Sequence, residues 1–79
     1  MLTESLYADF NNADRSGRLR LNCAGTARDL DQFGIRLSDG LRVRVHDDEL
    51  EADAEVQFSP DERIWVAVID WDAVRQIAR

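Results

Sequence analysis

Lysine is absent from the 79 residues, and cysteine, proline, histidine and methionine each occur once. Because Cys23 is the only cysteine, no disulfide within the chain can support the small core that a domain of this size buries. A lone thiol is typical of a reducing compartment, so we expect a cytoplasmic protein. The chain also lacks an apolar run of about 18 residues, and we therefore expect no transmembrane helix and no contact with a membrane.

The length predicts one small domain over residues 1–79. Its first part, residues 1–17, lacks the apolar core of a signal peptide, so we expect it to belong to the folded protein. Apolar side chains recur every four residues in this arm, at Leu2, Leu6 and Phe10. This spacing suits one face of a short helix. The alternative is an irregular arm whose apolar side chains pack against the core.

Charge is distributed unevenly along the chain. Residues 15–46 hold seven arginines against three aspartates, a balance of +4, whereas the remainder has a balance of −10 and the whole chain has −6. The two regions could neutralise each other in the fold, or the arginines could form a surface of their own. Net charge bears on solubility and on association rather than on the fold.

One run near the C-terminus would be apolar on both faces if it formed a strand. Residues 64–71 place Trp65, Ala67, Ile69 and Trp71 on one face, and Ile64, Val66, Val68 and Asp70 on the other. A strand with one wet face would alternate apolar and polar side chains. This segment is therefore predicted to be a central strand, with protein on both faces.

Three other segments alternate cleanly and are predicted to be half-buried strands: residues 18–23, 41–45 and 50–58. Residues 35–37 are expected to form a hairpin with 41–45, and Gly40 supplies the left-handed turn residue. The second hairpin is expected to turn over Ser59–Glu62 with Pro60 at its second position. That loop would place Phe58 opposite Arg63 and Val56 opposite Trp65. The strands at residues 41–45 and 50–58 are expected to be neighbours. Arg42 and Arg44 would then face the carboxylates of residues 50–58 across the pair.

Two short helices are expected. Thr26 and Asp29 resemble a capping box at the start of a helix near residues 27–33, which Gly34 would end in the left-handed conformation. A second helix would follow Asp72 at the C-terminus and bury Val74 and Ile77.

These elements predict a mainly β fold, either a small antiparallel barrel of SH3-like type or a strongly bent meander sheet, with a short helix near 27–33 and a short C-terminal helix. The string Gly34–Val43 resembles the diverging turn of such barrels. The wider pattern, including Gly17–Leu21, Gly25–Thr26 and Trp65–Ala67, resembles short uncharacterised bacterial proteins. That resemblance implies no activity and no named family.

The central strand also provides a candidate interaction surface, which consists of Ile64, Trp65, Val66, Val68 and Trp71. Tryptophan is enriched where proteins meet. The apolar face of Ile64, Val66 and Val68 needs a cover, either from the short helical pieces of the same chain or from a second copy in a homodimer.

Arginines suggest an alternative function. Arg18, Arg20, Arg42 and Arg44 are a candidate basic face, and small barrels bind RNA or DNA through such faces. The aromatic residues lie elsewhere in the sequence, and a carboxylate-rich strand lies beside these arginines. The net charge of −6 also opposes phosphate binding, so we predict against a nucleic-acid partner.

No residue pattern predicts catalysis, a cofactor or a metal. The loop 12–17 resembles the start of an EF-hand calcium loop, but it begins with Asn12, and Cys23 stands where the bidentate glutamate belongs. His46 has no implied catalytic partner, and Cys23 is expected to be a buried structural thiol. We therefore predict a non-enzymatic binding or adaptor module that acts through protein–protein contacts.

Overall fold

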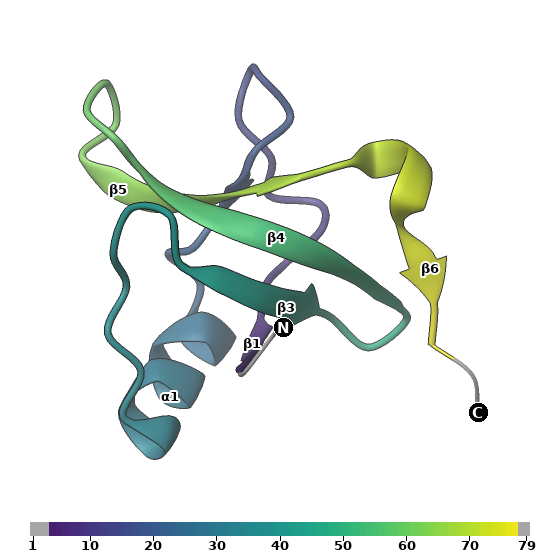
Figure 1. Cartoon of the computed structure of the whole chain (residues 1–79), viewed down its shortest axis with the longest axis horizontal. Coiled ribbons are helices and arrows are strands. Elements are labelled where there is room, and N and C mark those ends of the chain that lie inside the picture. Colours follow the sequence, from purple (N-terminus) through teal and green to yellow (C-terminus); the bar gives the residue numbers. More distant parts are fainter. Residues whose placement is uncertain (1–3, 78–79) are drawn as a thin grey trace.

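The computed structural model describes residues 4–77 of the chain (Figure 1). In chain order its elements are β1 (Ser5–Tyr7), β2 (Leu19–Arg20), α1 (Ala24–Phe33), β3 (Arg42–His46), β4 (Leu50–Ser59), β5 (Ile64–Ile69), the 3-10 turn η1 (Trp71–Ala73) and β6 (Arg75–Gln76). Within residues 4–77, no helix combines the length and the apolar character needed to cross a membrane.

The strands form one sheet in the order β1-β3-β4-β5-β2, and β6 pairs with β4. The sheet curls strongly into a half-barrel, which Figure 1 shows with α1 below β3 and beside β1. The predicted class, a small mainly β barrel or strongly bent sheet, is confirmed. The pairing is antiparallel throughout the described sheet except between β1 and β3, which run parallel.

β5 is central, as its apolar faces predicted. It is paired with β4 on one side and with β2 on the other. Val66 and Ala67 point to opposite faces, and both are fully buried. Ala67 belongs to the main core on the inner face of the curled sheet, together with Leu6, Leu19, Val43, Val45 and Val56. β5 is therefore buried on both of its faces at Val66 and Ala67.

The N-terminal arm is extended, with Ser5–Tyr7 as β1, so the predicted short helix is wrong and the alternative, an arm whose apolar side chains pack against the core, is confirmed; Leu2 lies outside the described residues. Leu6, Ala8 and Phe10 are all buried, which is the alternation of an extended chain. A spacing of four residues fits two periods of a strand as well as one turn of a helix. Tertiary contact decides between them, because β1 supplies the parallel partner that β3 needs.

α1 begins at Ala24, three residues earlier than expected, and the predicted capping box is wrong. Cys23 is the N-cap residue, and its side chain forms no capping hydrogen bond. Thr26 is buried within the helix, where its hydroxyl donates to the carbonyl oxygen of Tyr7 at 2.6 Å. The carboxylate of Asp29 accepts the N–H of Tyr7 at 2.8 Å. The two polar side chains therefore bind β1 and satisfy its outer edge.

Gly34 ends α1 with φ 65°, the left-handed conformation expected of it. The predicted strand at 35–37 is wrong, because β1 and β4 already occupy both sides of β3. Gly40 does adopt a left-handed φ of 88°, and its N–H donates to the carbonyl of Val56 at 2.8 Å. The segment between α1 and β3 is therefore an irregular connection that joins β4 only at its end.

The β4–β5 hairpin forms with a register two residues away from the expected one. Phe58 pairs with Trp65, and Val56 pairs with Ala67. The difference arises because the loop lies over residues 60–63, with Arg63 rather than a glycine in the left-handed region at φ 57°. Since a strand repeats every two residues, this shift exchanges neighbours but leaves each side chain on its expected face.

The expected C-terminal helix is also wrong. The 3-10 turn η1 is capped by Asp70, whose carboxylate accepts the N–H of Asp72 at 3.0 Å. β6 then pairs with Leu50 and Glu51 of β4. β5 pairs with β4 only from Ala54 onward, so the start of β4 would otherwise have an open edge. β6 covers that edge, and this contact outweighs the weak helical pattern of the last residues.

Gly25 provides a test of how α1 packs on β1. A Cβ atom at this position would lie 2.5 Å from Cδ1 of Tyr7. Alanine normally favours a helix over glycine by about 1 kcal/mol. We expect Gly25→Ala instead to lower the free energy of unfolding by about 1–3 kcal/mol, because the ring must move. Urea unfolding followed by tryptophan fluorescence measures this, with the exposed Gln32→Ala as control. A stabilised Gly25→Ala protein would contradict the packing.

Candidate interaction surface

The five residues predicted as an interaction surface do not form a single patch. Val66 is fully buried within the chain, on the outer face, where its cross-strand neighbours are Arg20 and Gln57. It is therefore not available to a partner. Ile64 and Val68 share this face and are half-buried. At Val66, this face is covered by other side chains of the same chain.

Trp65 lies on the inner face at the end of β5, where it meets Phe58 of β4. The two rings are edge to face, with centroids 5.2 Å apart. The sequence placed Phe58 inside the core, but its side chain is 40% exposed. Val56, two residues earlier on the same face, is fully buried. The inner face therefore continues past the core and ends in an accessible pair of aromatic rings, which we call the aromatic patch (Phe58 and Trp65).

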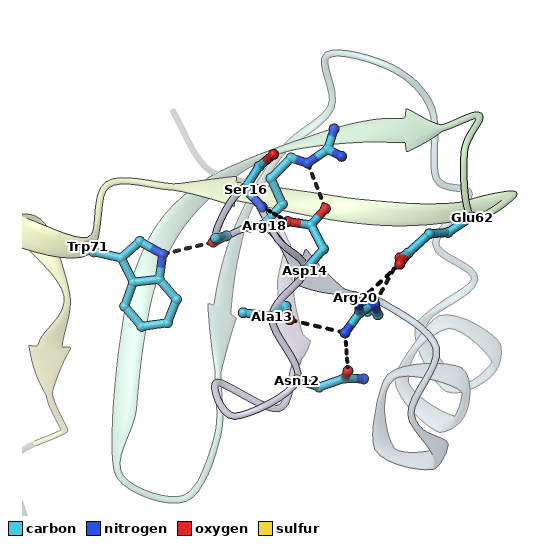
Figure 2. A network of polar contacts seen from close by, with 9 residues as sticks. Asn12, Ala13, Asp14, Ser16, Arg18, Arg20, Glu62 and Trp71 are labelled. Carbon is cyan, nitrogen blue, oxygen red and sulfur yellow. Dashed lines mark hydrogen bonds and ion pairs between the residues drawn. The ribbon is translucent and has the colours of Figure 1, made fainter.

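Trp71 lies beyond the opposite end of β5, in η1, and is 46% exposed. Its indole N–H donates to the carbonyl oxygen of Gly17 at 2.8 Å, as Figure 2 shows. Its ring stands edge-on to that of Phe10, with centroids 6.2 Å apart. Gly17 has a φ of 81°, and a Cβ there would lie 3.1 Å from the indole nitrogen. Trp71 thus holds η1 against the loop 14–17 by this hydrogen bond. It is not part of the aromatic patch.

Two of the candidate basic residues, Arg18 and Arg20, belong to a dense polar network (Figure 2). Arg20 donates through Nε and Nη2 to both carboxylate oxygens of Glu62, at 2.8 and 2.9 Å. Its Nη1 donates to the side-chain oxygen of Asn12 and to the carbonyl of Ala13. The hydrogen bond and charge of Glu62 raise the pKa of Arg20, and Arg20 in turn lowers the pKa of Glu62. This arginine joins three segments and is not a free cation.

The other two, Arg42 and Arg44, lie on the outer face of β3. Their guanidinium groups are 3.8 Å from the carboxylates of Glu55 and Glu51 respectively. This cross-strand pairing of arginines with carboxylates is the one that alternation predicted. β3 is separated from β2 by β4 and β5. At the usual strand spacing of about 4.8 Å, the two halves of the candidate basic face therefore lie about 14 Å apart across the sheet.

The loop that resembles an EF-hand start is closed by Asp14. One carboxylate oxygen accepts the N–H groups of Ser16 and Arg18, both at 2.9 Å, and the other accepts Nε of Arg18 at 2.8 Å. Desolvation alone would raise the pKa of Asp14, but these three donors outweigh it and hold the pKa below its ordinary value. The carboxylate is occupied by donors of its own loop, which is the geometry of an Asx turn rather than of a cation ligand.

The single cysteine and the single histidine both lie near Tyr7. Sγ of Cys23 is half-buried and lies 3.1 Å from Oγ1 of Thr26. The ring of His46 is edge-on to that of Tyr7, with centroids 5.9 Å apart. Desolvation, followed by the charges of Asp48 and Asp9, raises the pKa of the Tyr7 phenol. Sequence reasoning missed this arrangement because β1 was not recognised as a strand.

Comparison with known proteins gives no relative: no family model, no curated protein and no solved structure matches the chain. The sites described above therefore depend on their geometry alone.

Asp14 provides a prediction about stability and pH. Removing its charge-assisted hydrogen bonds in Asp14→Ala should lower the free energy of unfolding by about 1–2 kcal/mol at neutral pH. Because the folded protein holds the pKa of Asp14 below its ordinary 3.8, its contribution is complete above that value and is lost as the pH falls below it. The difference between wild type and variant should therefore shrink at about pH 3.

Urea unfolding at the two pH values measures the difference. Asp61→Ala, which removes an exposed carboxylate from the neighbouring β4–β5 loop, is the control. A variant whose deficit were the same at both pH values would show that the Asp14 charge plays no part.

Proposed function

We propose that this chain is a small, non-enzymatic binding module that acts by contact with another protein, with the aromatic patch (Phe58 and Trp65) at the centre of the contact. The observation that carries the proposal is the 40% exposure of Phe58 while its ring packs edge to face on Trp65. The single cysteine supports a cytoplasmic setting for this activity.

The chemistry of the patch supports a protein partner. Aromatic side chains bring a large apolar area with few rotatable bonds, so little conformational entropy is lost when a partner covers them. Tryptophan and arginine dominate the residues that contribute most to binding energy at interfaces. Trp65 is already held in place by Phe58 and by the core against which it packs. The patch is therefore ordered before a partner arrives.

Arg63 adds a second feature at the same end of the sheet. It is exposed, and it holds a left-handed backbone conformation that costs a non-glycine residue about 1–2 kcal/mol. Strained residues of this kind cluster at functional sites. Arg63 lies in the loop directly before Ile64 and Trp65, so a partner that covers the aromatic rings would also meet the arginine.

Nucleic acid is the weaker alternative, and the ion pairs explain why. All four arginines of the candidate basic face are within 4 Å of a carboxylate, namely those of Asp14, Glu62, Glu55 and Glu51. A phosphate would have to displace these carboxylates and then lie among them. Counterion release, which drives most nucleic-acid binding, requires cations that are not already neutralised.

A substitution at Phe58 tests the proposal. We expect Phe58→Ser to fold, because the side chain is exposed, and to weaken association by about tenfold or more, as removal of an interface anchor does. Sedimentation equilibrium at high concentration first establishes whether the partner is a second copy. If the wild-type chain dimerises, Phe58→Ser should be monomeric.

If the wild-type chain is a monomer, a photoreactive phenylalanine analogue at position 58 identifies a different partner in cell extract. The control carries the analogue at Asp72, which is also exposed but lies in η1, beyond the other end of β5. Cross-linking at position 58 alone supports the proposal. A monomer whose two positions cross-link equally, or a dimer that Phe58→Ser leaves intact, would contradict it.

The nucleic-acid alternative makes its own prediction. Labelled single-stranded and duplex oligonucleotides, titrated at low salt, should show no saturable binding to the wild-type chain. Binding that weakens with salt and is lost in an Arg42→Ser, Arg44→Ser double variant would instead establish the arginines as a phosphate-binding face.

A further inference from the structure

A groove runs along β1 on the side of the molecule that bears Tyr7, between α1 and the start of β4. It consists of three hollows that share lining residues, and we call it the β1 groove. The first hollow, of about 320 Å³, is lined by Glu4, Ser5, Asp29, Phe33 and His46. The second, of about 450 Å³, shares Asp29 and His46 with the first, and the third shares Tyr7 and Asp48 with the second. Each has roughly ten times the volume of a water molecule, which suits side chains.

The first hollow is the apolar end of the groove. Phe33, the last residue of α1, is 55% exposed there, the highest exposure among the large apolar side chains described. Further along, the rings of His46 and Tyr7 meet edge to face. Exposed aromatic rings in a groove are typical of binding sites. The aromatic residues of the groove come from α1, β1, β3 and, at Phe10, the segment after β1, and none belongs to the aromatic patch.

Backbone pairing with an added strand is blocked at Tyr7. Its N–H donates to Asp29, and its carbonyl oxygen accepts from Thr26. These two side chains of α1 occupy the outer edge of β1 at the middle of the groove. A ligand must therefore be recognised through side chains rather than through strand addition.

The charge of the groove indicates which side chains of a ligand it would recognise. Its three hollows are lined by the carboxylates of Glu4, Asp9, Asp29, Asp47, Asp48 and Glu49, against Arg28 and His46 as cationic or titratable groups. Asp9, Asp29 and Asp47 accept backbone N–H groups, which leave their negative charge in place. Arg44, which pairs with Ser5 across β1 and β3, lies 3.8 Å from Glu51.

The groove residues Ser5, Tyr7 and His46 share the outer face with Arg42 and Arg44, but the part of that face over β3 and β4 is different. There, Glu51, Asp53 and Glu55 each lie within 4 Å of an arginine. In the described part of the chain, Glu4, Asp9, Asp29, Asp47 and Glu49 have no such ion pair. The raised pKa of Tyr7, caused by desolvation and then by nearby carboxylates, agrees with a negative potential in the groove.

We infer that the β1 groove binds a segment of another protein that carries arginine or lysine next to an apolar residue. Phe33 contacts the apolar side chain, and the carboxylates of Glu4 and Asp29, which line the same hollow, face the cations. Charge complementarity selects this occupant, because an acidic or phosphorylated segment would meet the same carboxylates with repulsion. The site is separate from the aromatic patch, so it can exist whether or not the patch binds a partner.

Nuclear magnetic resonance of the full, ¹⁵N-labelled chain tests the inference with a blocked peptide of sequence Leu-Arg-Leu-Arg-Leu. We expect its addition to shift the amides of Ser5, Tyr7 and Phe33. The matched peptide Leu-Glu-Leu-Glu-Leu should shift none of them. Binding should weaken as salt is added, since the carboxylates are exposed to screening.

Two variants, measured in the same titration, test whether Glu4 and Phe33 contribute to peptide binding. Glu4→Gln and Phe33→Ser should each raise the Kd of the arginine peptide about two- to fivefold, the size expected of single exposed contacts. Glu55→Gln, the same change on the outer face of β4, and Phe58→Ser in the aromatic patch should leave it unchanged.

Three outcomes would overturn the inference. The arginine peptide could bind nowhere, it could shift only residues of the aromatic patch, or Glu55→Gln could weaken it as much as Glu4→Gln. Because Phe58 has no part in the groove, loss of association in Phe58→Ser with intact peptide binding would separate the two sites.

Discussion

β5 lies between β4 and β2 and is apolar on both faces, and the curl of the sheet follows from this placement. Its two apolar faces cannot both be protected by a flat sheet open to water, so the sheet must curl around one face and polar side chains must cover the other. On the inner face this produces the core around Ala67 and Val56. On the outer face, Val66 is buried between Arg20 and Gln57. The polar network of Figure 2 holds Arg20 at that position.

The half-barrel has sheet edges at β1, β4 and β2, and a different segment of the chain covers each of them. α1 uses Thr26 and Asp29 to satisfy the outer edge of β1. β6 covers the part of β4 that β5 does not reach. The segment at Asn12–Asp14 pairs with the free side of β2. Covered edges oppose association through the backbone. The contacts proposed for the aromatic patch and for the β1 groove accordingly use side chains.

Charge has two different roles in this molecule. The carboxylates near arginines fix loops and strand register, and individually exposed pairs of this kind stabilise a protein only slightly. The carboxylates along β1 are held by backbone N–H groups and keep their charge. The same residue types therefore serve structure beside β3 and β4 and create a negative surface along β1. Only the pairing of strands determines which carboxylates lie near an arginine and which do not.

The class of fold, the central position of β5, the inward faces of β3 and β4, and the left-handed glycines at 34 and 40 could all be predicted from the residues alone. These depend on periodicity and backbone preference, which are local properties of the chain. Three features could not be predicted in this way: the strand at residues 5–7, the binding of Thr26 and Asp29 to β1, and the pairing of β6 with β4. Each of these depends on a backbone edge supplied by a distant segment, and a local pattern such as Leu6 and Phe10 fits a helix or a strand equally well. The exposure of Phe58 was decided in the same way, because the loop at residues 60–63 and not the alternation of β4 sets where the core ends.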